Sequence, residues 1–419
     1  MKQAVVVSLM IGADYVSISA SECINGTFVR LYRTHQRLAN LEAGREFIAQ
    51  SLTTLGNKLP GAFSSINVIL DDFSLKQLRV NYQLVAKMLV DSRPSTAPVL
   101  QPSNYWTAYQ TIHAELHQDQ TTRGQQLVAL VPITFSYAAG TRKTPEHSKT
   151  FPSGLAVRQV GCDFSAVSVD RDFYNRILAV FAKTKIQIGH ILVASQLGFY
   201  KPELHLKAPL CFNLEFATKK TVLLTVQNQV VINQQELRFT YSDLVEQLTQ
   251  SYDISAEVAH NLIQNYGLIF ATSETDLTEV IYLNHENSLV TRQGLQKVIK
   301  SFLKTICLQA KPLIQAALSS PDYDYEVVIT GQLQILPHLS SYCQKYLEAT
   351  RVVTPPAAEL WNPTYETEQA LWRWLALLRT KIPAAARLAL SDHTTATAPR
   401  RTSSFKLAKK RPGAAAALA

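Results

Sequence analysis

The strongest constraint on the fold is an order of elements that occurs twice, about two hundred residues apart. The first occurrence opens with VVVSLMIGADYVSIS, residues 5–19, in which two alternating apolar runs flank Gly12 and an aspartate follows the bend. Asn25-Gly26 then separates two further alternating runs, a pair that favours a hairpin turn needing positive φ at both central residues. Residues 41–55 have the apolar spacing of a helix, and SSINVILDDF predicts another strand. The chain is therefore expected to open with three antiparallel strands, a helix and a fourth strand.

The same order returns in the second half of the sequence. APLCFNLEFA, KKTVLLTV and VVINQQELRFT predict three strands, with a turn at 227–229. Helices are expected at 242–250 and 255–266, then a strand near TEVIYL, a long helix at about 291–318, and a buried strand ending at Gly331. Two such units predict an α/β protein with two ribonuclease-H-like halves around a cleft, and crevices at strand ends are where such sheets usually bind ligands.

Length and composition are compatible with this architecture. The chain has 419 residues, 47% of them hydrophobic, which allows a large core and two or three domains at roughly 100–200 residues each. The N-terminal apolar run stops at Gly12 without a small-residue cleavage site, and no segment approaches the ~18–20 apolar residues of a membrane-spanning helix. We therefore expect a protein that is cytoplasmic or peripheral on the inner face of the cell membrane.

Cysteine usage and motif content exclude several classes of site. The five cysteines are scattered and mostly lie in apolar runs, which indicates buried free thiols in a reducing compartment. The sequence contains no CxxC, HExxH, GxSxG, GKS or GKT. Metal-site, serine-hydrolase and P-loop functions therefore have no supporting motif.

The formal net charge of +9 is concentrated at one end of the chain. Residues 371–419 contain ten Lys and Arg but a single acid, Asp392, so the remaining residues are formally neutral. A basic tail on a neutral body favours contact with an acidic surface, membrane or polymer over a DNA-reading domain.

The first turn resembles the first phosphate turn of the actin-like ATPase superfamily and, within it, of the bacterial cell-division family FtsA. That family has Leu-Asp-Ile-Gly followed by a small residue. Leu9, Ile11 and Gly12 match, and Met10 stands in the place of the aspartate.

The second turn and the adenosine strand resemble the family in the same order. Residues 213–220 stand where the family has Asp-Ile-Gly-Gly-Gly-Thr-Thr-Asp, so one threonine is kept and every glycine and aspartate is lost. VVITGQLQILPHL resembles the adenosine strand and its glycine turn, and His260 and Ile263 replace the glutamate and lysine that hold the nucleoside. The resemblance assigns four residues to a remnant nucleotide cleft: Gly12, Asn213, Thr218 and Gly331.

A further segment resembles the subdomain that FtsA carries inside its first half. LVALVPITFSYAAG and FPSGLAVRQVGCDFSAVSV match it at Pro132, Pro152, Gly154 and Leu155, and WNPTYETEQALWRWLALLRT resembles the closing helix, capped by Asn362. The resemblance implies a first half at 1–82 and 167–204, an insert at 83–166, a second half at 205–390 with an outer lobe at about 240–290, and a flexible basic tail at 391–419.

The loss of acidic residues bears on the chemistry. Phosphates are bound by closely approaching backbone N–H groups, and Mg²⁺ requires carboxylate oxygens. Because Met10 and Asn213 remove both carboxylates of the family pattern, we expect a pseudo-ATPase with no cofactor, which binds ATP and Mg²⁺ weakly or not at all and has no catalytic or metal-binding residues.

Two alternatives concern charged residues near the turns. Asp14, Asp71 or Asp72 could restore a metal site in an active ATPase with rearranged ligands; otherwise these acids are expected to be solvated at strand ends, satisfying turn amides. Lys219 and Lys220 could bind phosphate as point charges, or could simply form an exposed hairpin end.

The resemblance implies a non-enzymatic adaptor in cell division that links FtsZ filaments to the cytoplasmic membrane at the septum. The FtsZ C-terminal peptide would dock on the outer lobe, and self-association into filaments is possible, with no specific nucleic acid. An FtsA-like scaffold of type IV pili is the alternative adaptor.

The basic tail has two readings. As a membrane anchor it would contact an anionic membrane surface through Phe405, Lys406, Leu407, Lys409, Lys410 and Arg411. A disordered basic tail is the other expectation.

Overall fold

The computed structural model describes most of the chain up to residue 355 and a few positions beyond it. The described residues are 5–24, 27–37, 44–59, 63, 65–75, 78–91, 99–139, 144–181, 187–197, 208–268, 278–283, 289–318, 324–355, 371, 373–376 and 381. The Asn25-Gly26 turn, Asn362 and the tail residues that are expected to contact a membrane lie outside these ranges.

The first half is built on a five-stranded sheet in the order β3-β2-β1-β4-β9. Its strands are β1 (Val6–Ile11), β2 (Tyr15–Ile24), β3 (Thr27–Arg37), β4 (Ser65–Leu70) and β9 (Gln187–Val193). β1 to β3 are antiparallel, with Ile24 opposite Thr27, whereas β1, β4 and β9 run parallel. Every residue of β1 is buried, as is usual for a central strand whose sheet is covered on both faces.

Helices α1 (Gly44–Lys58) and α3 (Arg171–Phe181) cover one face of this sheet. In α1, Ile48, Leu52 and Leu55 are buried at helical spacing, and they share a core cluster with Val7, Leu9 and Ile11 of β1. The even-numbered residues of β1 point to the other face, which is closed differently, as described below.

The second half repeats the same sheet order, β12-β11-β10-β15-β16. Its strands are β10 (Leu210–Phe216), β11 (Thr221–Gln227), β12 (Val230–Leu237), β15 (Glu326–Gly331) and β16 (Arg351–Val353). The pairing pattern is also the same, since β10, β11 and β12 are antiparallel while β10, β15 and β16 are parallel. The expected recurrence of strand order is confirmed.

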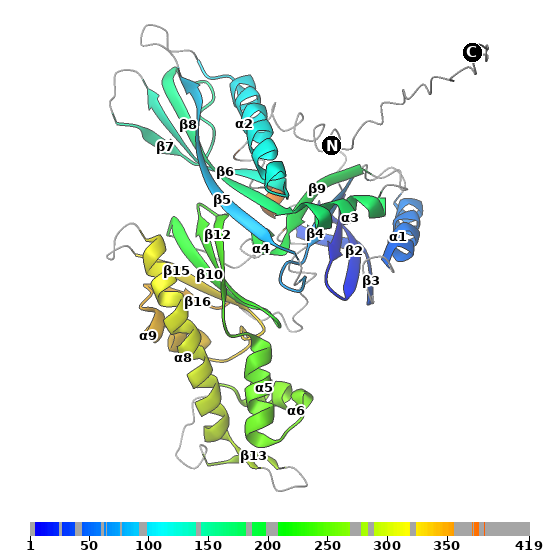
Figure 1. The fold of residues 1–419 in the computed structure, drawn as a ribbon, viewed down its shortest axis with the longest axis vertical. Helices are drawn as coiled ribbons and strands as arrows, with labels where there is room; N and C mark the ends of the chain where they lie inside the picture. The colour runs from blue at the N-terminus through cyan, green and yellow to red at the C-terminus, as the bar shows by residue number, and fades with distance from the viewer. Residues whose placement is uncertain are drawn as a thin grey trace, which may run out of the picture.

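The helices of this half are α5 (Tyr241–Tyr252), α6 (Ala256–Tyr266), α8 (Arg292–Ala317) and α9 (Leu339–Leu347). α5 begins where Thr240 accepts a hydrogen bond from the Asp243 amide, as the N-terminal capping preference of threonine predicts. A short hairpin of β13 (Val280–Leu283) and β14 (Leu289–Thr291) leads into α8 and lies at the far end of this half (Figure 1).

An insert separates β4 from α3 and carries its own four-stranded sheet, in the order β5-β8-β6-β7. Its elements are β5 (Val80–Asp91), α2 (Pro102–Thr122), β6 (Gln125–Ala139), β7 (Glu146–Ser148) and β8 (Val157–Asp170). α2 packs on one face of this sheet around Tyr105, Phe135 and Phe164. β5 and β8 are long enough to run from the insert down to β12 of the second half (Figure 1).

The three bodies meet in a shared apolar cluster. Met10 and Val6 from β1, Val131 and Ile133 from β6, and Val230 from β12 belong to it. Leu371 and Trp374 of the C-terminal segment complete it, with Leu375 packed alongside, as expected for an apolar helix stripe. The first half, insert and second half are therefore joined around one core and not only by chain connections.

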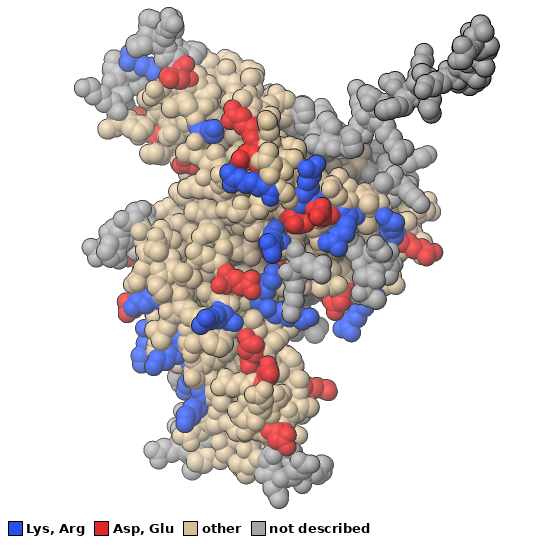
Figure 2. Space-filling view, viewed as in Figure 1, with Lys and Arg blue, Asp and Glu red and all other residues tan. Residues whose placement is uncertain are grey.

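Charge on the body is mixed. Figure 2 shows Lys and Arg interspersed with Asp and Glu on the face drawn, in agreement with a formally neutral body. Within the described ranges, no helix is both long and apolar enough to span a membrane. Cys162, Cys211, Cys307 and Cys343 are buried free thiols, as predicted.

Candidate functional site

The turn between β1 and β2 is closed by its own residues. The Gly12 amide donates to the Tyr15 carbonyl at 2.9 Å, and the Ala13 amide donates to Ser74 Oγ at 3.0 Å. The Tyr15 ring lies against Gly12 so closely that a Cβ at position 12 would stand 2.1 Å from Tyr15 Cε1. Two amides that could hold a phosphate are thus already bonded, and an aromatic ring covers the glycine.

Met10, in the place of the family's aspartate, points into the apolar cluster that joins the three bodies. Its side chain is 4% exposed. Val131, Val230 and Trp374, each from a different element, belong to the same cluster. A carboxylate here would be buried in an apolar environment without a partner, which is strongly unfavourable. This position therefore fits a hydrophobic side chain and not a ligand of hydrated Mg²⁺.

Asp71 and Asp72 follow β4, and both are buried, so the expectation that they are solvated is wrong. Asp71 accepts hydrogen bonds from the Tyr15 hydroxyl at 2.9 Å and from the Phe73 amide at 3.2 Å. Burial raises the pKa of the Asp71 carboxyl despite these bonds. The Tyr15 ring that covers Gly12 is therefore held in place by Asp71.

Asp72 is the more deeply buried of the two, at 1% exposure. Its Oδ1 accepts a hydrogen bond from the Ser195 amide at 2.9 Å, whereas Oδ2 has no partner. Burial raises the pKa of Asp72 to about 6. Asp14, in contrast, is exposed, as expected. Within the described ranges, no three His, Cys, Asp or Glu side chains come together as a possible metal site.

The polar residues of β10 at the predicted second phosphate turn are hydrogen-bonded within their own sheet. Asn213 and Glu215 lie on the same face of β10, and Thr330 of β15 is opposite Glu215. The Thr330 hydroxyl lies 2.8 Å from Asn213 Oδ1 and also contacts Glu215 Oε2. The single Thr330 hydroxyl proton can be donated to only one of these two oxygens. If the Asn213 amide is flipped, its Nδ2, which otherwise has no partner, donates to the Thr330 oxygen while the Thr330 hydroxyl donates to Glu215, so that all three groups are satisfied. Glu215 therefore points into the sheet and not toward a phosphate.

The backbone conformation and close packing at Gly331 require a glycine whether or not a nucleotide binds. Its φ is +90°, and a Cβ at this position would be 2.3 Å from the Phe216 carbonyl oxygen. The Gln332 amide donates to the same oxygen at 2.7 Å. Thr218 is exposed in the β10–β11 turn, and its carbonyl accepts a hydrogen bond from the Ser242 amide, which ties the turn to the start of α5.

The two residues that replace the family's nucleoside-binding pair are also engaged internally. His260 Nδ1 is 2.9 Å from the Tyr241 hydroxyl, and Ile263 is fully buried in the core of the second half. Neither side chain is therefore presented to a nucleoside.

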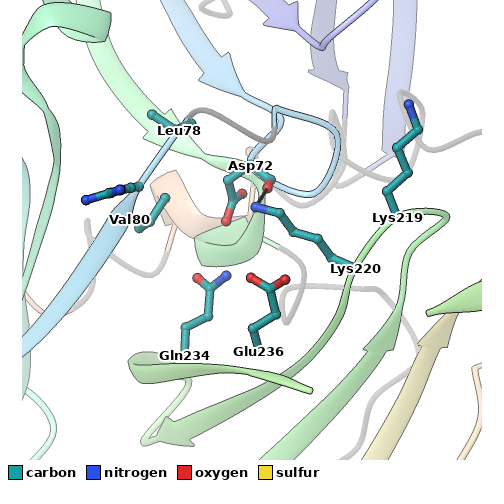
Figure 3. A pocket seen from close by; sticks show the side chains of 8 residues that line it. Asp72, Leu78, Val80, Lys219, Lys220, Gln234 and Glu236 are labelled. Atoms are coloured by element: carbon teal, nitrogen blue, oxygen red, sulfur yellow. Dashed lines mark hydrogen bonds between the residues drawn. The ribbon is translucent and has the colours of Figure 1, made fainter. Parts of the chain in front are cut away.

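A cavity of about 550 Å³ lies where the two halves face each other, and its lining differs from the predicted site. Asp72, Leu78, Arg79 and Val80 line it from one side, and Lys219, Lys220, Gln234 and Glu236 from the other. None of the four residues assigned to the remnant cleft belongs to this lining. In Figure 3, Asp72, Lys220, Gln234 and Glu236 point into the space between the halves, whereas Lys219 points away.

Lys220 bridges the cavity from the second half to the first. Its Nζ donates to the Asp72 carbonyl oxygen at 2.9 Å (Figure 3). The ammonium also lies close enough to the Asp72 carboxyl to oppose the rise in its pKa. Lys220 is thus a contact between halves and not an exposed hairpin end, whereas Lys219 is exposed, as the alternative predicted.

Taken together, the residues at this cleft do not fit a magnesium nucleotide. Met10 is in a core, Gly12 is under Tyr15, Glu215 is bonded inside its sheet, and an ammonium crosses between the halves. Sequence reasoning missed the roles of Tyr15 and Ser195. Tyr15 directly follows the turn at Gly12, but nothing in its spacing indicates that its ring folds back over that glycine.

No family model matches the sequence, and no curated protein matches it either. Among solved structures, the chain is similar to the PilM–PilN type IV pilus biogenesis complex, at 12% identity and a TM-score of 0.46 over 94% of this chain and 98% of that chain. It is also similar to MreB5 of Spiroplasma citri bound to ADP, at 8% identity and a TM-score of 0.44 over 90% and 98%. EutJ, an ethanolamine utilization protein of Carboxydothermus hydrogenoformans, gives 9% identity and a TM-score of 0.39 over 88% and 89%.

The fold class follows from the molecule's own topology. Two sheets of the same strand order and pairing, each with helices and each interrupted along the chain by an insert or outer lobe, define the actin-like ATPase fold. The chain is therefore an actin-like α/β protein with an inserted subdomain.

Proposed function

We propose that this protein is a non-enzymatic, FtsA-like adaptor that links FtsZ filaments to the inner face of the cytoplasmic membrane during cell division. The single observation that supports a non-catalytic role most directly is the state of the first turn. Met10 lies in an apolar cluster, and the Tyr15 ring covers Gly12. In this proposal the first turn organises neither Mg²⁺ nor phosphate, and the actin-like body serves as a scaffold and not as a nucleotide switch.

The first test is a titration of labelled ATP with Mg²⁺ into the purified chain, with turnover followed in parallel. We expect no saturable binding below roughly millimolar concentration, a free energy weaker than about −4 kcal/mol, and no hydrolysis. A sub-micromolar complex or steady turnover would instead support an active ATPase with a rearranged metal site.

The partner is tested separately, by a pull-down with the FtsZ C-terminal peptide. In this proposal the peptide docks on the outer lobe, about residues 240–290, and a scrambled peptide of the same composition is the control. Specific capture would support the FtsA-like role. No capture, together with no ATP binding, would favour a scaffold of the type IV pilus kind.

Attachment to membrane is assigned to the basic tail. Sedimentation with anionic vesicles is expected to pellet the full chain but not a chain lacking residues 400–419, since each basic residue near an anionic surface contributes ~1 kcal/mol. Equal pelleting of both chains would rule out the tail as the anchor.

A further inference from the structure

Lys381, the most C-terminal residue that the structure describes, ends in a cage of three backbone carbonyl oxygens. Its side chain is 2% exposed. Nζ donates to the carbonyls of Pro132 at 3.1 Å, Ile133 at 3.0 Å and Asn228 at 3.3 Å. The first two belong to β6 of the insert, and the third belongs to the β11–β12 turn of the second half. One ammonium group therefore joins two bodies that are about a hundred residues apart in sequence.

The cage is formed where two sheet ladders are interrupted. The register of β6 against β8 shifts between Pro132 and Thr134, which makes Ile133 the additional residue of a bulge. Asn228 and Gln229 have φ of +48° and +67°, as in a two-residue hairpin turn. At this bulge and in this turn, the three carbonyls accept hydrogen bonds from the ammonium. Three donors then meet three acceptors, a match that a planar guanidinium would not make.

Two further hydrogen bonds fasten the same two surfaces. Asn228 Nδ2 donates to Thr134 Oγ1 at 2.6 Å, and Ser165 Oγ donates to the Val231 carbonyl at 2.6 Å. The junction between insert and second half is therefore narrow and polar at this point, and Lys381 lies at its edge.

The rest of the C-terminal segment contacts the first half. Leu371 and Trp374 are buried in the cluster that also contains Met10, and the Trp374 ring packs edge-on against His190 at 5.5 Å between centroids. The described residues of this segment thus touch all three bodies: Leu371 and Trp374 pack on the first half and the insert, and Lys381 bonds the insert and the second half.

We propose that Leu371, Trp374 and Lys381 of the C-terminal segment together lock the insert against the second half, and that Lys381 is the latch of this contact. The relative position of these two bodies is then set by the chain's own C-terminal segment and not by a ligand between the halves. Withdrawal of Lys381 leaves three carbonyls without a donor and frees the insert at its junction with β12.

Hydrogen exchange measured by mass spectrometry on the full chain tests the latch. Lys381→Met keeps the length and apolar stem but removes the three donors, and Lys297→Met, at an exposed lysine on α8, is the matched control. We expect at least tenfold faster exchange in peptides covering 131–134 and 227–231 for K381M. Peptides from β10 and α8 should be unchanged, and the control should behave as wild type.

A second variant and a ligand arm complete the experiment. Lys381→Arg keeps the charge with poorly matched donors, and we expect a smaller increase at the same two sites. Excess ATP with Mg²⁺ on the wild-type chain should leave those peptides unchanged. Unaltered local exchange in both variants would overturn the proposal, as would equal loss of protection throughout the K381M chain. If ATP alone tightened the junction, the pseudo-ATPase proposal would fail, but the latch would still be judged by the variants.

Discussion

The two halves share one strand order, but the turns at which the sequence predicts a remnant phosphate site are occupied in opposite ways. In the first half the change is apolar and steric, because Met10 enters a hydrophobic cluster and Tyr15 covers Gly12. In the second half it is polar, because Glu215 is engaged by Thr330 and Lys220 reaches across to Asp72. The sheets are held by buried strands that do not depend on a ligand, so the topology can persist while each turn changes independently.

The two halves also differ in the free-energy cost of burying the side chains next to each turn. Replacing a carboxylate by Met10 removes a group that would be expensive to bury without a partner. The second half instead buries a different carboxylate, that of Glu215, which is in contact with the Thr330 hydroxyl. Met10 before the first turn is therefore part of the hydrophobic core, whereas Glu215 before the second turn belongs to a buried polar network in which each member needs its partner.

The largest effect in this comparison is expected at Gly331. Gly331→Ala combines a positive φ with a Cβ that would meet the Phe216 carbonyl oxygen at 2.3 Å, so β10 and β15 would have to move apart. We expect the free energy of unfolding to fall by about 3 kcal/mol or more, measured by urea denaturation. Gly56→Ala is the control, since nothing lies within 4 Å of a Cβ there and alanine favours the helix by about 0.5–1 kcal/mol. Equal effects of the two substitutions would contradict the role of this close approach.

At the first turn, a smaller and conditional effect is expected. Gly12→Ala would place a methyl group against the Tyr15 ring, and we expect a loss of about 2 kcal/mol, as for overpacking in a core. In a Tyr15→Ser background the ring is absent, so most of that loss should disappear. The double-mutant cycle, measured by the same urea denaturation, isolates this coupling. Additive losses would mean that the ring is not what restricts position 12.

Substitution of Asp72, between the two turns, is expected to stabilise the protein, in contrast to the two glycine substitutions. Burial raises the pKa of Asp72 in the folded state to about 6, above the ordinary 3.8 of an aspartate, so the folded state binds more protons and stability is lost as the pH rises from about 4 to 6. Asp72→Asn removes the buried charge while keeping an acceptor for the Ser195 amide. We expect the variant to be more stable than wild type by about 1–2 kcal/mol at pH 7, and less so at pH 4.5.

The control for this experiment is Asp14→Asn, at an exposed position where no change is expected. A D72N chain that is less stable than wild type at pH 7 would show that the carboxylate is stabilised in the folded state, contrary to the effect of its burial.

Local patterns were enough to predict the fold, and they were not enough to predict the site. The long helix expected at about 291–318 is α8, Arg292–Ala317, and the strand expected to end at Gly331 is β15. Alternation and helical spacing report which face of an element is apolar, and the sequence carries this directly. Which residues cover that face depends on contacts between positions far apart in the sequence. The Tyr15 hydroxyl donates a hydrogen bond to Asp71, and Lys381 donates one to the carbonyl of Ile133, 248 positions away. For this reason Asp71 and Asp72 were expected in solvent, although they are buried.

The smallest predicted effect is a pH-dependent difference in stability at Lys381, a site distinct from both turns. Burial lowers the pKa of the Lys381 ammonium to about 8 from 10.5, so between these values the unfolded chain binds more protons and stability rises with pH. We expect the difference in unfolding free energy between wild type and K381M to grow by about 1 kcal/mol between pH 7 and pH 8.8. Cys162 and Lys149 interact electrostatically with the ammonium and are present in both chains. Burial holds the pKa of the Cys162 thiol well above its ordinary value, so this thiol stays protonated in the folded state of both chains over this pH range. Lys297→Met should follow wild type at every pH, and a gap between wild type and K381M that stays constant would show that Lys381 does not titrate in its carbonyl cage.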